Sequence, residues 1–471
     1  MDEKPYTIET AISEDGLTAQ LQIVPCADED FEIAVDDLRA ALNAAGITHG
    51  VKDDVLVEIA QAKHLNTWEV VAEGTPPIPG HDGEVIFHFS KDKPSVQLKE
   101  DAAGHVNLWD LNLIQNVNQG DLLCELIPST TGTYGTSVKG EPIPATDGAT
   151  ATLPKGTNVD ISEDGLRMTA SVCGMVTYDG EKVIVEHTYT VDCVDASIGN
   201  IRFIGSVVVN GEVGDGFEVH AGEDITIAMS VGHVKLSAGR DVKLGGGVLK
   251  GTITAGRDVT AKFIQDADVT AQGRIVVEDY IQNSEVIAEG PVLVKNSSGW
   301  IMGGAVSSEQ WIYSQMIGKQ DASLNTEIII GSHPNLAHVR TGLVEEIYHR
   351  VEDFLQFRSS LSKLRVLKAK GQLTPKQEQL YDKILQAINF VRAEILDKQK
   401  TVDDITDRIR RTYSGEIYAP GAVYSGTAIR IGGRRKLIEA QSPAVKYSLI
   451  EGQIKEEAFT MRKEIEELLG K

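Results

Sequence analysis

The segment Ala221-Gly-Glu-Asp-Ile225 returns as Ala238-Gly-Arg-Asp-Val242 and again as Ala255-Gly-Arg-Asp-Val259, at a step of 17 each time. Ala271-Gln-Gly-Arg-Ile275 follows after a step of 16, and Ala288-Glu-Gly-Pro-Val292 after another step of 17. Upstream, Ile204-Gly-Ser-Val-Val208 fits one further step of 17. Downstream, Ser308-Glu-Gln-Trp-Ile312 fits a step of 20, with Gly303-Gly304 as the expected insertion. A fixed period of this length indicates a repeat architecture.

Two apolar columns run in step with this repeat. One column is Val219, Leu236, Ile253, Val269 and Val286, and the other is Ile227, Leu244, Ala261, Val277 and Val294. Each unit is too short for a helix pair and alternates with period two. The pattern predicts a single-stranded β-solenoid with about 17 residues per coil, in which coils stack ~4.8 Å apart and the columns fill the interior. We expect the glycines at the corners to supply positive φ angles.

A different periodicity follows the solenoid repeat. Apolar residues recur every three or four positions at Leu343, Ile347, Phe354, Phe357, Leu361 and Leu364, and again from Ile384 to Ile409. Thr374, Pro375 and Gln377 between the two runs match a helix N-cap with proline at the first helical position. The spacing predicts an antiparallel coiled-coil hairpin of two long helices.

The predicted fold class is therefore mainly β with α. We expect an N-terminal α+β domain (1–78), a small all-β barrel or sandwich (79–187), the β-solenoid (188–335), the coiled-coil hairpin (336–412) and a β return with a short C-terminal helix (413–471). Open solenoid ends template further coils unless they are capped. We expect residues 80–187 to cap one end and the C-terminal return to cap the other.

Composition narrows the possible functions. The 471 residues include 45 basic and 69 acidic side chains, a net charge of −24. This disfavours nucleic acid and anionic membranes as main partners, because both require a basic surface. No apolar run suits a signal peptide or a membrane span. The four cysteines form no CxxC pair, which favours reduced thiols in a cytoplasm over disulfides or a zinc site.

The order of several turn motifs resembles the bacterial flagellar assembly protein A family. The motifs are Pro79-Gly80-His81-Asp82-Gly83, Gly120-Asp121-Leu122-Leu123, Gly199-Asn200-Ile201, Val207-Val-Val-Asn-Gly211, Ala261-Lys262-Phe263-Ile264 and Gly303-Gly304. The resemblance covers most of residues 75–335 and returns at Tyr418 to Ile431. It implies a β-solenoid with an N-terminal domain and a coiled-coil hairpin in a cytoplasmic bacterial protein, and it implies no reaction or cofactor.

Few residues suggest a chemical site. Asp224, Asp241 and Asp258 would stack as a carboxylate column, which could hold a cation such as calcium or, as we favour, cap the corner turns. Arg434, Arg435 and Lys436 form a basic run that could hold an anion or an acidic partner, or simply lie on a solvated turn. No histidine pair, catalytic constellation or cofactor motif is found, so we expect no metal, no cofactor and no enzyme.

The sequence favours a non-catalytic cytoplasmic scaffold that recruits proteins, and the family resemblance links it to flagellar or cell-envelope assembly. Leu343, Val344, Ile347, Val351 and Phe354 form an apolar stripe wider than one helix contact needs. This stripe could dimerise, bind a partner helix or pack on the solenoid. The alternative is a glycan- or small-ligand-binding protein, or a β-helix enzyme, with a site between the N-terminal β domain and the solenoid.

Overall fold

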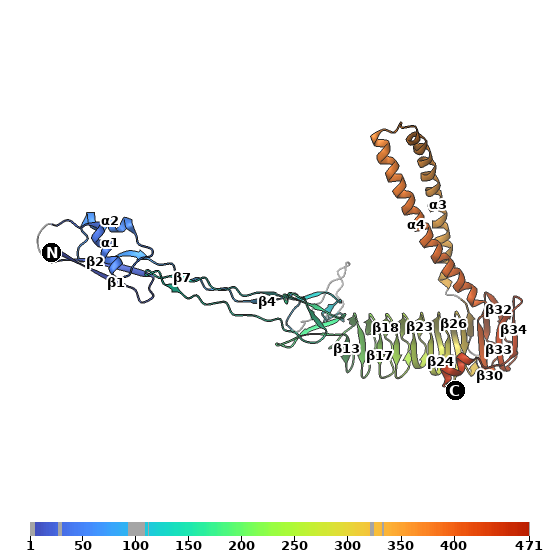
Figure 1. Cartoon of the computed structure of the whole chain (residues 1–471). Coiled ribbons are helices and arrows are strands. Elements are labelled where there is room, and N and C mark those ends of the chain that lie inside the picture. The colour runs from blue at the N-terminus through green and yellow to red at the C-terminus, as the bar shows by residue number, and fades with distance from the viewer. Residues whose placement is uncertain are drawn as a thin grey trace. The chain divides into compact units, whose positions relative to one another are not determined.

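The computed structural model describes residues 5–26, 31–92, 109–111, 113–320, 325–331 and 334–470. The chain divides into two compact units (Figure 1). The first holds Met1–Lys93, Gln119–Val172 and Val176–Val185, and the second holds Pro94–Asn118, Cys173–Met175 and Glu186–Lys471.

The first unit begins with the expected α+β fold. Strands β1 (Tyr6–Ile12), β2 (Thr18–Pro25) and β3 (Glu69–Glu73) form an antiparallel sheet in the order β1-β2-β3. Helices α1 (Val35–Ala44) and α2 (Asp53–Ala62) supply Leu38, Leu42, Leu56 and Ile59 to the core of this fold, all at most 2% exposed. Apolar residues at helical spacing thus cover an alternating strand face.

Short antiparallel strands follow in residues 84–186. Strands β4 (Glu84–Phe87), β6 (Leu122–Ile127), β10 (Arg167–Ala170) and β9 (Val159–Ile161) pair in that order, and β7 (Gly135–Thr136) pairs with β8 (Pro142–Ile143). The remaining strands are β5 (Asn116–Val117), β11 (Gly174–Tyr178) and β12 (Val183–Glu186).

Within the first unit, three extended segments run side by side as a thin stalk between β7 and β4 (Figure 1). The segment 74–83 exchanges backbone hydrogen bonds with 130–136, and it also donates from Gly80 to the Thr146 carbonyl at 2.9 Å. A Cβ on Gly80 would lie 2.0 Å from the Thr130 carbonyl oxygen, and one on Gly148 would lie 1.9 Å from the His81 oxygen. Only glycine permits this approach, which is also why collagen needs glycine at its axis.

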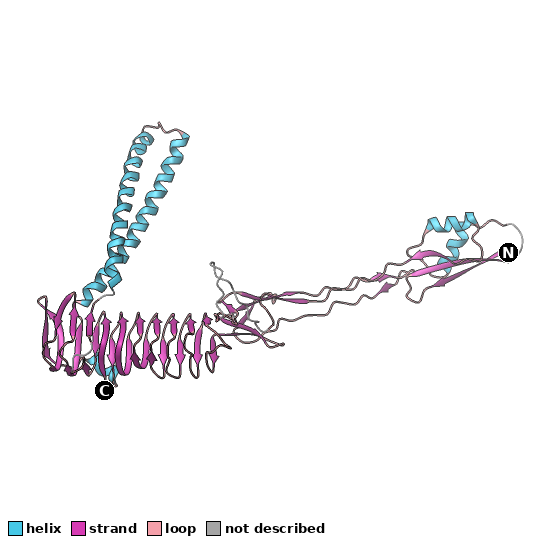
Figure 2. Cartoon of the chain, turned by 180° about the vertical axis from the view of Figure 1, so that it is seen from behind, coloured by secondary structure: helices cyan, strands magenta, loops and turns pink. Residues whose placement is uncertain are grey.

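The second unit contains the β-solenoid, whose strands stack in successive coils (Figure 2). The strands are β13 (Thr188–Val191), β14 (Ile201–Phe203), β15 (Ser206–Val209), β16 (Glu218–Ala221), β17 (Ile225–Ile227), β18 (Lys235–Ala238), β19 (Val242–Leu244), β20 (Val248–Leu249), β21 (Thr252–Ala255), β22 (Val259–Gln265), β23 (Asp268–Ala271), β24 (Ile275–Ala288), β25 (Val292–Val294), β26 (Trp300–Ser308), β27 (Trp311–Tyr313), β28 (Met316–Ile317), β29 (Thr326–Ile330), β30 (Glu416–Val423) and β31 (Ala428–Ile431).

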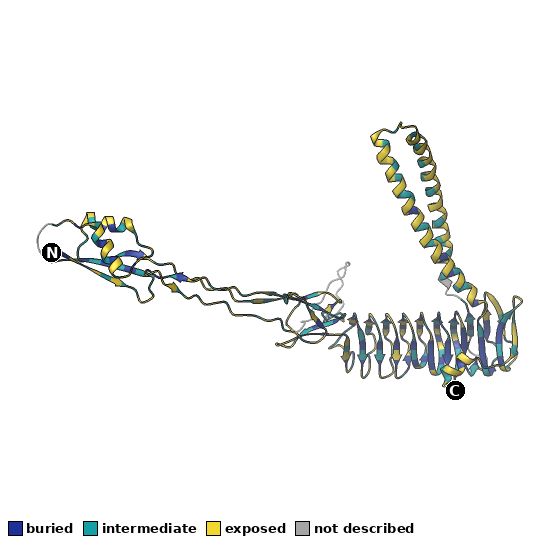
Figure 3. Cartoon of the chain, in the orientation of Figure 1, coloured by how far each residue is buried: buried dark blue, intermediate teal, exposed yellow. Residues whose placement is uncertain are grey.

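Strand pairing confirms the repeat. Val219 pairs in parallel with Leu236, Leu236 with Ile253, Ile253 with Val269 and Val269 with Val286. Every residue of the two predicted columns is at most 5% exposed, and the columns belong to one continuous core (Figure 3). The alternation of strand side chains therefore buries one face along the whole stack.

Two details of the predicted register are wrong. Val207, not Val208, pairs with Ile225, so the first step is one position longer than predicted. The extra residues of the longest step do not lie at Gly303-Gly304. Val277 pairs with Val294 at the usual step whereas Tyr280 pairs with Trp300, so the insertion lies in the turn between Val294 and Trp300. The turns lie outside the stacked columns, so extra residues can be inserted there without changing the packing of the interior.

The expected reason for the corner glycines is also wrong. Gly222, Gly239 and Gly256 have no positive φ. A Cβ on Gly239 would instead lie 2.0 Å from the Gly222 carbonyl oxygen, and one on Gly256 would lie 2.1 Å from that of Gly239. Close approach of neighbouring coils, not left-handed backbone, thus selects glycine in this column.

Both ends of the parallel stack are covered. At the first coil, Asn116 accepts a hydrogen bond from the Ile204 N–H and donates one to the Arg202 carbonyl, and Trp109 contacts the Phe217 ring. At the far end, β32 (Arg434–Leu437), β33 (Ser442–Ile450) and β34 (Gln453–Ala458) add in antiparallel pairs. The charged β34 is then the last strand of the sheet, which suits an edge that must not recruit another chain.

The hairpin is inserted between β29 and β30. Helix α3 (Pro334–Ala369) and helix α4 (Pro375–Thr412) run antiparallel, with Arg350 bonded to Glu394 at 3.2 Å and Lys398 bonded to Glu346. The Thr374 N–H donates to the Gln377 side chain at 2.9 Å, as the N-cap pattern predicts. Gly415 lies against Ile330, so the chain enters and leaves the hairpin at neighbouring points.

The C-terminal helix α5 (Lys463–Leu469) covers an outward-facing column of the solenoid. This column reads Thr226, Lys243, Thr260, Val276, Leu293, Tyr313 and Tyr418 along successive coils. It turns apolar at Val276, and from there it forms a second core with Ile465, which is 0% exposed. The helix therefore shields apolar surface that would otherwise face solvent.

Candidate functional site

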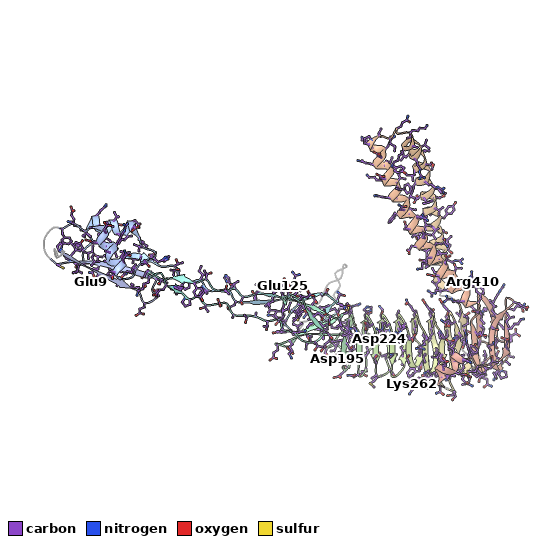
Figure 4. All side chains as sticks on the ribbon, in the orientation of Figure 1. Glu9, Glu125, Asp195, Asp224, Lys262 and Arg410 are labelled. Carbon is purple, nitrogen blue, oxygen red and sulfur yellow. The ribbon has the colours of Figure 1, made fainter. Side chains whose placement is uncertain are left out.

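The aspartate column lies along one corner of the solenoid, where Figure 4 labels Asp224. Asp224 Oδ1 accepts from the Asp241 N–H at 3.0 Å, and Asp241 Oδ1 accepts from the Asp258 N–H at 3.2 Å. Each carboxylate therefore caps the backbone of the next coil.

An arginine from the next coil neutralises each of these aspartates. The Arg240 guanidinium donates to Asp224 at 2.8 Å, that of Arg257 to Asp241 at 2.6 Å, and that of Arg274 to Asp258 at 2.8 Å. The Arg257 hydrogen bonds hold the pKa of Asp241 below its ordinary value, although burial opposes this shift. Each carboxylate is thus committed to a guanidinium and a backbone N–H, an arrangement that differs from the oxygen cage of a calcium site.

No group of three metal-binding side chains is found in the described parts of the chain. An apolar cavity of about 350 Å³ lies between β29 and the α4 C-terminus. Its lining includes Arg430, which is paired with Glu327 at 2.7 Å. A cavity of about 210 Å³ beside the first coil contains Asp110 and Arg202, whose charged atoms are 3.9 Å apart. Neither lining clusters the carboxylates that a glycosidase needs.

The base of the hairpin is fixed to the solenoid by a partly buried ion network that the sequence reasoning missed. Arg408 of α4 donates to both oxygens of Glu309, at 2.8 and 3.2 Å, and lies 2.9 Å from Glu289. Glu309 is only 8% exposed. Its hydrogen bonds raise the pKa of Arg408 above the ordinary value, so the guanidinium stays charged. Neighbouring Arg410, labelled in Figure 4, is exposed and bonds only within α4.

The predicted hairpin stripe divides between two faces. Leu343, Ile347 and Phe354 are half-buried, whereas Val344 and Val351 are 48% and 37% exposed. Packing on the solenoid therefore does not cover Val344 and Val351. Tyr348 and Leu355 continue the exposed side, at 65% and 54% exposure.

The basic run Arg434, Arg435 and Lys436 lies on β32 rather than in a turn. The turn is Gly432-Gly433, and both of its glycines have positive φ. Arg434 and Arg435 are exposed, while Lys436 lies over the Tyr447 ring and 3.9 Å from Glu456. The structure does not bring this run together with the hairpin stripe into one site.

Among the described residues, no helix is both long and apolar enough to cross a bilayer. All four cysteines are free, and Cys124 is buried.

Comparisons with known proteins identify the family. The model described as Flagellar Assembly Protein A beta solenoid domain matches residues 187–454, and the one described as Flagellar Assembly Protein A N-terminal region matches residues 8–181. No curated protein and no solved structure matches the chain. The two matches cover most of the sequence and agree with the solenoid and the N-terminal sheets. The chain therefore belongs to the flagellar assembly protein A family.

Proposed function

We propose that this chain is a non-catalytic scaffold that recruits proteins during flagellar assembly in the cytoplasm. The observation that carries the proposal is the hairpin. It is anchored at its base by Arg408, yet α4, which is described over its whole length, buries only Val391, Val402, Ile405 and Thr412. Two long helices that cover little of the chain's own core provide surface for other molecules.

The solenoid suits the role of a rigid support. Its continuous core and its aspartate–arginine column connect successive coils, so each coil is stabilised by contacts with its neighbours. The four free cysteines support a reducing compartment. Family membership supports flagellar assembly as the setting.

The test is quantitative affinity purification from the organism that the chain comes from. The full chain is compared with a variant whose residues 336–411 are replaced by a short Gly/Ser loop, which the proximity of Gly415 to Ile330 permits. Partners lost only with the hairpin support the proposal. Recovery of the same partners by both proteins contradicts it.

Self-association through the hairpin is a second form of recruitment. Val344, Tyr348, Val351 and Leu355 are spaced 4-3-4 along α3 and are all exposed, which is the pattern of a second helix-packing stripe. Light scattering of the purified chain tests it. A dimer that becomes monomeric on Tyr348→Glu supports this form, and a monomer at all concentrations refutes it.

A further inference from the structure

The outer half of the hairpin has a charge opposite to that of the rest of the chain. Residues 356–390 contain seven basic side chains and two acidic ones, in a protein of net charge −24. All seven are exposed, and none of these seven described side chains lies within 4.0 Å of a carboxylate. The net charge of the whole chain therefore hides this locally basic region.

Four lysines of this region share one flank of the hairpin. The residues that face the partner helix are Phe354, Phe357, Leu361 and Leu364 on α3, and Ile384, Ile388, Val391 and Ile395 on α4. With these at heptad positions a and d, Lys363, Lys376 and Lys383 occupy position c. Lys370 directly follows the last residue of α3 and continues the same register, because its N–H still bonds to the Val366 carbonyl at 3.3 Å. The two acidic residues, Glu378 and Asp382, fall at positions e and b on the opposite flank. We call these four lysines the lysine flank.

The lysine flank also carries the most exposed aromatic ring of the hairpin. Phe390 is 70% exposed and Leu380 is 48% exposed, at positions c and g of α4. Positions g of the two helices border the groove between them, and positions c lie on its outer sides. The flank thus combines exposed apolar side chains with exposed lysines.

We propose that the lysine flank binds an acidic amphipathic helix of a protein partner, which deepens the proposed function and rests on it. Apolar residues of that helix would contact Leu380 and Phe390, while its carboxylates would face lysines on both sides. The flank extends over residues 376–390 of α4, so it accommodates a helix of about 15 residues, roughly 22 Å long.

The geometry favours a helix over a membrane or a nucleic acid. The loop between the helices contains one large apolar residue, the half-buried Leu373, so the tip is not built for insertion into a bilayer. Exposed apolar residues lie along the helices rather than at their end. The acidic remainder of the chain would repel a long polyanion.

The experiment measures fluorescence anisotropy of a labelled peptide of three heptads, with leucine at positions a and d and glutamate at e and g. The full chain should bind it, and more tightly at low salt. Substituting Lys363, Lys370, Lys376 and Lys383 together by Gln should weaken binding at least tenfold. The matched control changes Lys139, Lys182, Lys250 and Lys262 to Gln; these are exposed lysines elsewhere, and their loss should alter affinity less than twofold.

A second variant separates apolar contact from charge. Leu380→Ser with Phe390→Ser keeps every charge and should weaken binding about fivefold. The proposal is overturned if the peptide does not bind, if a peptide with lysine at e and g binds equally well, or if both lysine variants lose the same affinity.

Vesicles of one part phosphatidylglycerol to two parts phosphatidylcholine provide the membrane control. Binding to these vesicles that needs the lysine flank, without peptide binding, would assign the flank to a membrane surface and also overturn the proposal. Partners lost with the whole hairpin but retained by the lysine variant would leave the proposed function standing and remove only this inference.

Discussion

Replacing Gly239 by Ala tests why neighbouring coils of the solenoid can stack so closely. The added methyl carbon would lie 2.0 Å from the Gly222 carbonyl oxygen, where real contacts are at least 3.0 Å. The coils must therefore separate locally by about 1 Å, the difference between these two distances. This stretches the hydrogen bond from the Gly239 N–H to the Ala221 carbonyl, now 3.0 Å, and the one from the Arg240 N–H to the Glu223 carbonyl, now 2.9 Å.

Losing two backbone hydrogen bonds costs about 2 kcal/mol, and loosening the packing around them costs about 1 kcal/mol more. We therefore expect Gly239→Ala to destabilise these coils by about 3 kcal/mol. Hydrogen exchange followed by mass spectrometry over residues 218–271 measures this locally, which is needed because a chain of several units does not unfold in two states.

Gly342→Ala is the matched control, because it adds the same methyl group to α3 where no other described atom lies within 4 Å. It should stabilise the helix by up to about 1 kcal/mol. Gly239→Asn separates the two explanations for this glycine, a positive φ angle and the close approach of the neighbouring coil. Asparagine tolerates a left-handed backbone, but its side chain does not fit where two coils approach closely. Unchanged protection in Gly239→Ala, or full tolerance of Asn, would refute the reasoning.

Three further changes test other contacts. Arg408→Ala leaves the buried Glu309 carboxylate without its main partner, so hydrogen exchange at residues 402–412 should show a loss of about 2 kcal/mol of local stability. Arg410→Ala removes only an exposed ion pair and should leave exchange nearly unchanged. Equal effects of the two substitutions would contradict the conclusion that Arg408 fixes the hairpin to the solenoid. Ile465→Asp puts a charge into the α5 core and should cost about 3 kcal/mol, seen as faster trypsin cleavage next to the helix; an unchanged cleavage rate would show that α5 is not held by this contact. The two ring nitrogens of His187 lie 2.9 Å from the Cys173 carbonyl and 3.0 Å from Glu223, so the hydrogen bond to the carbonyl, followed by the Glu223 charge, raises the pKa of His187. Its stabilisation is complete below pH about 6.5 and is lost as pH rises through the higher folded-state pKa. Protection of the first coil should therefore fall as pH rises above about 6.5 in the natural chain and not in His187→Gln. The same fall in both would exclude His187 as the cause.

The interior of the solenoid could be predicted because parallel stacking places equivalent residues in columns. Val219, Leu236 and Ile253 repeat at a fixed step, since each must fill the same place in its coil. The turns were less predictable. The insertion before Trp300 lies where no column constrains chain length, so the sequence did not reveal its position.

Contacts between distant segments explain most of what was missed. The Pro79-Gly80-His81-Asp82-Gly83 motif was interpreted as a turn, but its glycine and aspartate join three separate segments of the stalk. Asp82, for example, accepts from the Ala149 N–H at 2.6 Å. The apolar residues from Val276 onward in the outward-facing column are a sequence signal that could have indicated where α5 packs.

The candidate partner surface shows the limit of composition. Net charge averaged over 471 residues concealed the lysine flank, which becomes apparent only when heptad positions are assigned to α3 and α4. The ion network at the hairpin base was hidden for a different reason, because Arg408 and Glu309 are 99 residues apart.

The most direct test of the scaffold is complementation of cells that lack the protein. The full chain and the variant with residues 336–411 replaced are expressed at equal levels, and flagella are counted by electron microscopy. The full chain should restore flagella, whereas the variant should not. Hydrogen exchange of the variant should show that its solenoid is still folded. Full restoration by the variant would contradict the claim that the hairpin recruits the partners needed for assembly.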